Sequence, residues 1–122
     1  MKYKLLVLDV DGTLLNDAKE ISKRTLASLL KVQQMGIRVA LASGRPTYGL
    51  MPLAKTLELG NYGGFIISYN GGQIINAQNG EILFERRINP EMLPYLEKKA
   101  RKNNFAISVS YTHLRAHETG RN

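Results

Sequence analysis

The sequence has no cysteine, no apolar run of membrane-spanning length and no complete signal-peptide pattern. The absence of cysteine excludes a disulfide framework and removes any argument for an oxidising compartment. A bilayer span needs about 20 consecutive apolar residues, and the chain has no such run. The N-terminus begins like a signal peptide, but Asp9 follows too soon for an apolar core and a cleavage site. We therefore expect a cytoplasmic protein of one domain, or part of one, without a membrane partner.

Positive charge is in excess, since the formal net charge is +7. Such a charge raises the question of a nucleic-acid partner. Much of the excess falls at the exposed face and end of an expected helix, at Lys98, Lys99, Arg101 and Lys102, where cations favour the helix dipole. Basic residues interleaved with aromatics, typical of single-strand binders, are absent. We expect no nucleic-acid partner; the alternative predicts binding that weakens steeply with salt.

The last residues, 109–122, break the pattern of the preceding chain. Residues 109–119 back-translate, codon for codon, into the adapter used in transposase-based sequencing libraries. We interpret 109–122 as an adapter-derived tail that is not native, and we expect the gene to be cut short there. The two histidines of the chain, His113 and His117, lie in this segment at the i, i+4 spacing of a metal pair. We assign them no function.

The most informative segment is an apolar run that ends in two carboxylates and a glycine turn. Residues 5–8 have strand character, and Asp9, Asp11, Gly12 and Thr13 follow. Glycine permits a sharp turn, and the threonine hydroxyl can hydrogen-bond within it. An acidic loop closing a strand is common, but this four-letter pattern (D-x-D-G-T) is expected by chance in about one chain in a thousand of this length. The two carboxylates are therefore candidate catalytic residues.

Strands and helices alternate through the first half of the chain. Apolar strands are expected over 5–8, 37–42 and 65–68, and helices over 22–35 and 46–57. Ser22 is a suitable N-cap for the first helix, Gly36 a suitable stop, and Pro46 fits the first turn of the second. This alternation predicts an α/β fold with a parallel sheet.

The pattern changes after Tyr69. Two short strands, 73–75 and 81–84, flank the hairpin turn Asn79–Gly80. A helix is expected from Asn89–Pro90 to about residue 103. Another strand is expected over 105–108. Short antiparallel strands with a helix favour a separate lid over more of the parallel sheet.

Two further polar segments follow the second and third strands. Ser43, Gly44 and Arg45 lie between a strand end and a helix N-terminus, where α/β sheets bind ligands and phosphate is favoured. A serine there is often only a helix cap. Asn70, in Tyr69–Gly72, follows the third strand and is ideal for a tight turn. Arg45 either orients substrate or pairs on the surface.

Together, the segments D-V-D-G-T-L-L-N, S-G-R-P and S-Y-N-G-G resemble those of the haloacid dehalogenase (HAD) superfamily, in its Cof-type branch, subclass IIB. The resemblance covers residues 1 to about 108. It implies a HAD-like Rossmannoid parallel sheet, present in part over 1–80, and the start of an inserted α/β cap over 81–108. Members of the branch are mostly Mg²⁺-dependent phosphatases of small phosphorylated metabolites.

The resemblance also implies roles for individual residues. Asp9 would be the nucleophile that forms an aspartyl-phosphate, and Asp11 the general acid/base. Mg²⁺ would be bound by the Asp9 carboxylate and the Asp11 backbone carbonyl. Phosphate would be bound by Ser43, by the Gly44 backbone and by the Val10 N–H, with Arg45 and Asn70 as substrate-orienting candidates.

No residue matches the family's third-motif lysine or its fourth-motif aspartates, which lie after the cap. We therefore expect the first strand to have an unpaired edge, and this polypeptide alone to fold poorly and be inactive. The full-length parent is expected to be a phosphatase. A phosphotransferase or phosphomutase of the same superfamily, and a non-catalytic metabolite-binding module, remain alternatives. Neither the substrate nor the oligomeric state follows from the sequence.

Overall fold

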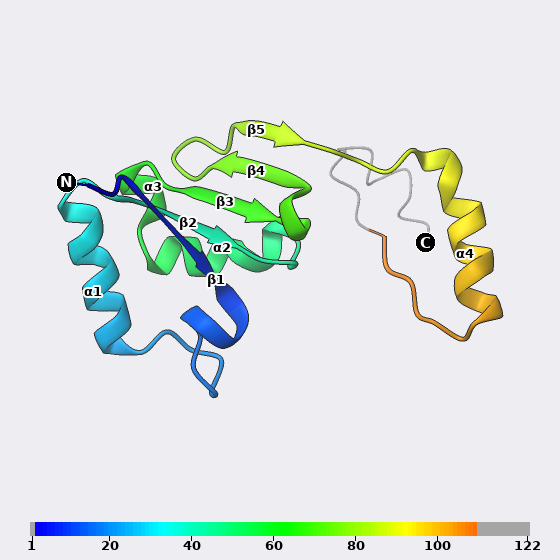
Figure 1. Cartoon of the computed structure of the whole chain (residues 1–122), viewed down its shortest axis with the longest axis horizontal. Coiled ribbons are helices and arrows are strands. Elements are labelled where there is room, and N and C mark those ends of the chain that lie inside the picture. Colours follow the sequence, from blue (N-terminus) through cyan, green and yellow to red (C-terminus); the bar gives the residue numbers. More distant parts are fainter. Residues whose placement is uncertain (1, 110–122) are drawn as a thin grey trace. The chain divides into compact units, whose positions relative to one another are not determined.

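The computed structural model describes residues 2–109 (Figure 1). Of the predicted tail, 109–122, all but residue 109 lies outside the described residues, His113 and His117 included. The chain divides into two compact units, the first from Met1 to Arg87 and the second beginning at Ile88. Each unit is described by itself.

The first unit contains one sheet of five strands in the order β1-β2-β3-β4-β5 (Figure 1). The strands are β1 (Leu5–Asp9), β2 (Arg38–Ala42), β3 (Phe65–Ser68), β4 (Gln73–Asn76) and β5 (Ile82–Glu85). The first three strands pair in parallel, whereas β4 and β5 pair antiparallel. Helix α1 (Lys23–Gln34) connects β1 to β2, and α2 (Thr47–Thr56) with the short α3 (Leu59–Tyr62) connects β2 to β3. The predicted α/β class with a parallel sheet is confirmed.

The boundaries of α1 follow from its end residues. The Ser22 side chain accepts a hydrogen bond from the Thr25 backbone N–H, which satisfies one of the free donors of the first turn. After Gln34 the chain leaves the helix at Gly36, whose φ of 95° is accessible to glycine at little cost. Both predicted signals therefore act as expected.

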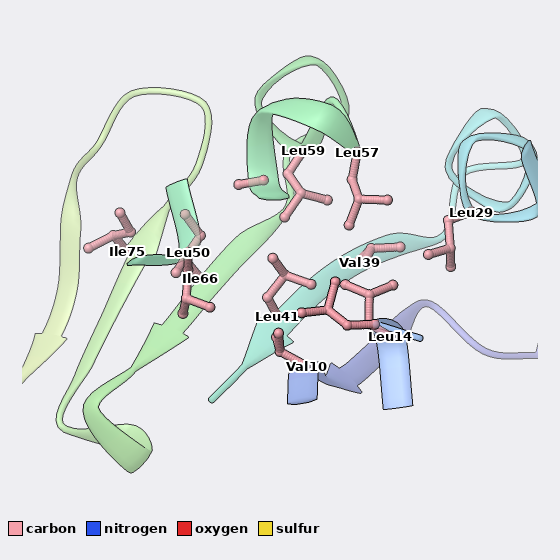
Figure 2. Packing of buried hydrophobic residues seen from close by; sticks show 12 residues of the cluster. Val10, Leu14, Leu29, Val39, Leu41, Leu50, Leu57, Leu59, Ile66 and Ile75 are labelled. Carbon is pink, nitrogen blue, oxygen red and sulfur yellow. The ribbon is translucent and has the colours of Figure 1, made fainter. Parts of the chain in front are cut away.

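A single cluster of buried apolar side chains lies between the helices and one face of the sheet (Figure 2). The sheet contributes side chains that share one face by alternation and register: Leu6, Leu8, Val39, Leu41, Ile66 and Ile75. The helical segments contribute Leu29, Leu50, Ala54, Leu57 and Leu59. Gly64, directly before β3, packs against β2 and leaves no room for a side chain, because a Cβ there would lie 2.4 Å from the Val39 carbonyl oxygen.

The hairpin after β3 differs from the predicted separate lid, because its strands extend the sheet of the first unit. The chain reverses through η2 (Tyr69–Gly71), where all three residues have positive φ. β4 then pairs antiparallel with β3, and β5 with β4. The Arg86 N–H also donates to the Gly72 carbonyl at 2.8 Å. Pairing satisfies backbone groups that β3 would otherwise expose at its edge. The assignment of 81–108 to a cap stays a prediction about the full-length protein.

The second unit contains a turn of 3₁₀ helix, η3 (Pro90–Met92), followed by α4 (Leu93–Lys102). The Asn89 side chain accepts from the Glu91 N–H, as expected for the predicted N-cap. The predicted strand over 105–108 is wrong, since these residues have no regular structure and Phe105 is exposed. An isolated strand leaves its backbone groups without partners, and none of the described strands pairs with this segment.

Strand β1 is an edge strand, as predicted, because β2 is its one partner within residues 2–109. No helix among the described residues is long and apolar enough to cross a bilayer.

Candidate functional site

The loop after β1 carries both candidate carboxylates. Asp9 is the last residue of β1, and the buried residues Val10 and Leu14 anchor the short turn η1 (Val10–Leu14) to the core. Asp11 (φ −73°, ψ 125°) and Gly12 (φ 83°, ψ −4°) have the dihedrals of a type II turn, which requires positive φ at its third position. The glycine of the motif is therefore needed for the turn that carries Asp11.

The first carboxylate, Asp9, is exposed, and among residues 2–109 its side chain has one weak hydrogen bond, from within its own loop. The Thr13 hydroxyl donates to an Asp9 carboxylate oxygen at 3.4 Å. An exposed oxygen with a long hydrogen bond keeps most of its capacity to accept a ligand. Asp9 is thus chemically accessible, as the predicted nucleophile has to be.

The loop after β2 brings Ser43 beside the first loop. Asp9 is paired in register with Ala42, the residue that precedes Ser43. The Ser43 hydroxyl accepts a hydrogen bond from the Arg45 N–H at 3.0 Å, and its own O–H remains a donor. Helix α2 then begins at Thr47. This places a hydroxyl donor suited to an anion beside Asp9, in a loop that leads into a helix N-terminus.

Arg45 forms the strongest polar contact of the site. Its Nε donates to one Asp11 carboxylate oxygen at 3.1 Å, and its Nη2 donates to the other at 2.7 Å. The hydrogen bond from Arg45, together with the charges of Arg45 and Lys19, holds the pKa of Asp11 below its usual value. In return, the hydrogen bond to Asp11 raises the pKa of Arg45. Of the two predicted roles of Arg45, the structure shows pairing, and its partner is the second candidate carboxylate.

Asn70 lies against the second loop. Its backbone N–H donates to the Ser43 carbonyl at 3.0 Å. A Cβ at Gly44 would lie 3.0 Å from the Asn70 side-chain oxygen, so the amide covers Gly44 closely. Tyr69 and Asn70 have φ of 53° and 55°, a left-handed conformation that is uncommon for two successive non-glycine residues. Strained backbone of this kind clusters at functional sites.

Polar side chains beneath the second loop were not predicted. The Thr47 hydroxyl is hydrogen-bonded to the Ser68 hydroxyl and to the Gln73 side-chain oxygen. Ser68 and Gln73 are buried, although both lie in strands. They connect the first turn of α2 to the ends of β3 and β4. The signal in the sequence was the presence of polar residues at positions whose strand neighbours are apolar.

The residues predicted to bind Mg²⁺ offer oxygen atoms. Mg²⁺ prefers oxygen ligands in octahedral geometry, and both the Asp9 carboxylate and the Asp11 backbone carbonyl belong to this class. Within residues 2–109, no group of three or more His, Cys, Asp or Glu side chains is placed to hold a metal ion. The chemistry of the two donors fits magnesium, and they supply only part of an octahedral shell.

The structure therefore brings the predicted site residues together at one edge of the sheet. Asp9, Asp11, Ser43, Arg45 and Asn70 all come from the carboxyl ends of three neighbouring strands. This edge is where parallel α/β sheets bind ligands. The fold and site define an α/β domain with a carboxylate pair next to hydrogen-bond donors suited to an anion.

Comparison with known proteins assigns the family. The profile of the haloacid dehalogenase-like hydrolases matches residues 6–117, and the chain belongs to this family. A haloacid dehalogenase-like hydrolase of Bacteroides thetaiotaomicron, solved by crystallography, is similar with 53% identity and a TM-score of 0.80. The match covers 84% of this chain and 39% of that one.

Two proteins of Bacillus subtilis are also similar. YxeH, a phosphatase by name, is 35% identical over 115 residues, which is 90% of this chain and 43% of YxeH. YcsE, named 5-amino-6-(5-phospho-D-ribitylamino)uracil phosphatase, is 31% identical over 111 residues, which is 88% of this chain and 43% of YcsE. The chain thus spans less than half the length of these relatives.

Proposed function

We propose that the full-length protein containing this segment is a Mg²⁺-dependent phosphatase of small phosphorylated metabolites that works through an aspartyl-phosphate at Asp9. The observation that carries the proposal is the register of β1 and β2, which sets an accessible carboxylate beside the loop that carries Ser43 and leads into α2. Membership of the hydrolase family and the phosphatase names of its relatives support it.

In the first half-reaction, a carboxylate oxygen of Asp9 forms a bond to phosphorus. The bond between phosphorus and the leaving oxygen breaks, and Asp11 gives its proton to that oxygen, so an alcohol leaves. The Ser43 hydroxyl and the N–H groups of Gly44 and Val10 hold the phosphoryl oxygens. Bound Mg²⁺ would mask the repulsion between the Asp9 carboxylate and the phosphate dianion.

In the second half-reaction, the Asp11 carboxylate takes a proton from water. The water oxygen bonds to phosphorus as the bond between Asp9 and phosphorus breaks, which releases inorganic phosphate and restores Asp9. One carboxyl group thus acts first as acid and then as base. The remaining charge-neutralising groups are proposed to come from parts of the protein outside residues 2–109.

The Asp9→Asn variant of the full-length protein tests this function. Phosphate release from p-nitrophenyl phosphate with Mg²⁺ should fall by a factor on the order of 10³ or more, because an amide is a poor nucleophile. Acid quenching during turnover of a ³²P-labelled substrate should trap a labelled protein in the wild type and none in the variant. Asp17→Asn is the control, since it neutralises an exposed carboxylate of the following loop and should leave both signals unchanged. Normal turnover by Asp9→Asn contradicts the proposal.

A further inference from the structure

The ion pair between Arg45 and Asp11 joins the two loops that flank the candidate phosphate site. Asp11 belongs to the turn after β1, whereas Arg45 precedes α2 and lies 34 positions further along the chain. Both carboxylate oxygens of Asp11 accept from the guanidinium, at 3.1 Å and 2.7 Å. The side chain of the proposed proton donor is therefore held at both oxygens.

The backbone of Arg45 is held by hydrogen bonds, while its guanidinium can change partners. Its N–H donates to the Ser43 hydroxyl and its carbonyl accepts from the Tyr69 N–H. The guanidinium also makes a long contact of 3.4 Å to the Gly49 carbonyl, and 34% of the side chain is exposed. A guanidinium binds carboxylate and phosphate with the same bidentate geometry. A phosphoryl group bound at Ser43 would therefore compete with Asp11 for Arg45.

We infer that Arg45 exchanges partners when substrate binds: it pairs with Asp11 in the free site, and it moves to the phosphoryl oxygens of a bound phosphate monoester, which releases Asp11. The inference rests on the proposed function, and it adds a link between phosphate binding and the availability of the acid/base. Arg45 is thus a positioning residue for Asp11 in the free site.

A second cation makes this release less costly. The Lys19 ammonium lies 3.9 Å from an Asp11 oxygen, and 74% of the Lys19 side chain is exposed. The Lys19 ammonium can stay close to the Asp11 carboxylate when Arg45 moves away, since a long exposed side chain has many accessible rotamers. Asp11 then retains a neighbouring positive charge, but its two oxygens are released from the bidentate pair. Both of its proton transfers require this release.

A double-mutant cycle with inorganic phosphate as the probe tests the exchange. Phosphate affinity is measured by isothermal titration calorimetry on the full-length protein with Mg²⁺ present, for wild type, Asp11→Asn, Arg45→Met and the double variant. In the Arg45 background, Asp11→Asn should tighten phosphate binding about fivefold, because the partly exposed guanidinium no longer has a carboxylate partner. In the Arg45→Met background the same substitution should change affinity by less than about twofold.

Two further variants separate the exchange from a simple loss of negative charge. Lys19→Met removes a cation near the same carboxylate without removing the bidentate pair, so Asp11→Asn should still tighten binding about fivefold in that background. Arg45→Lys keeps the positive charge but loses the bidentate geometry of the guanidinium, and it should reduce the effect of Asp11→Asn on phosphate affinity to an intermediate value. It also provides a milder variant if Arg45→Met does not fold.

The outcomes distinguish the two proposals. Equal tightening by Asp11→Asn with and without Arg45 overturns the exchange of partners. It leaves the proposed phosphatase function standing, provided the wild type binds and releases phosphate. Absence of phosphate binding in every protein, wild type included, overturns both. Tightening that depends on Arg45 and not on Lys19 establishes the exchange.

Discussion

The two faces of the sheet differ in how far their apolar side chains are covered. On one face, Val39, Leu41 and Ile66 are fully buried beneath α1, α2 and α3. On the other, Leu5 and Val7 of β1 are each 49% exposed. The apolar cluster described within residues 2–109 lies on the first face. The strands therefore carry apolar residues for two faces, as strands buried on both sides do, while the described helices cover one.

The two strands that carry the site differ in the same way. Asp9 lies on the same face of β1 as Val7 and Leu5, so its side chain starts from the less covered face of an edge strand. Ser43 follows β2, whose residues 39–41 are buried. The proposed phosphate-binding loop thus follows a buried strand, whereas the proposed nucleophile ends a half-exposed edge strand.

The largest effect on stability is expected from shortening a buried side chain on the covered face. Leu41→Ala removes a fully buried side chain and should lower the free energy of unfolding by about 3 kcal/mol, through lost burial and the cavity left behind. Urea unfolding of the full-length protein, followed by circular dichroism, measures the change. A loss below about 1 kcal/mol would mean that this core is loosely packed.

A matched pair of substitutions compares the faces directly. Val39→Thr places a hydroxyl in the covered cluster and should cost about 1–3 kcal/mol of unfolding free energy, because the hydroxyl loses its water. Val7→Thr makes the same change at a half-exposed position and should cost less than about 0.5 kcal/mol. Equal costs in the 122-residue chain would contradict the difference between faces. Equal costs only in the full-length protein would show that further chain covers the Val7 face there.

A smaller effect is expected at the end of the helix that covers β1 and β2. Ser22→Ala removes the acceptor for the Thr25 N–H and should lower the unfolding free energy by about 1 kcal/mol. Ser28→Ala is the control, because Ser28 lies exposed within α1 and alanine is a good helix former. Thermal unfolding of the two variants should differ in sign or in size; equal destabilisation would contradict the capping role.

The smallest effect is a pH dependence at the site. The pKa of Asp11 is held below its usual value by Arg45, so the folded state binds this proton more weakly than the unfolded state. The pair therefore contributes stability above the ordinary pKa of 3.8 and loses it as the pH falls through the lowered pKa. The difference in melting temperature between wild type and Arg45→Met should be small at neutral pH and vanish on acidification. A difference that grows toward low pH would contradict this sign.

The sequence predicts the parts of the fold that depend on local patterns. Alternation of apolar runs and helix signals places β1, β2 and β3, and the carboxyl ends of parallel strands bring Asp9 and Ser43 to the same edge. The partner of a short strand is not a local property. Residues 82–85 form a strand because β4 offers an edge, whereas 105–108 have no described partner.

The same limit applies to the site. The sequence indicates that Arg45 is near a candidate phosphate loop, but its contact with Asp11 depends on how two loops turn in space. The type II turn at Asp11–Gly12 and the hydrogen bond from the Arg45 N–H to the Ser43 hydroxyl together decide it. The buried contact of Thr47 with Ser68 and Gln73 is likewise a product of the tertiary fold. Short motifs therefore predict which residues gather and not how they pair.

The pairing of Asp9 with Ala42 fixes the distance between the starts of the two loops, and no side chain determines this distance. Neighbouring strands lie about 4.8 Å apart wherever backbone hydrogen bonds join them, and the two loops of the site start from this pair. Substitutions in either loop can alter its chemistry without changing the width at which the loops begin. A gap of constant width suits a group of constant size, and the phosphoryl group has the same size in every phosphate monoester.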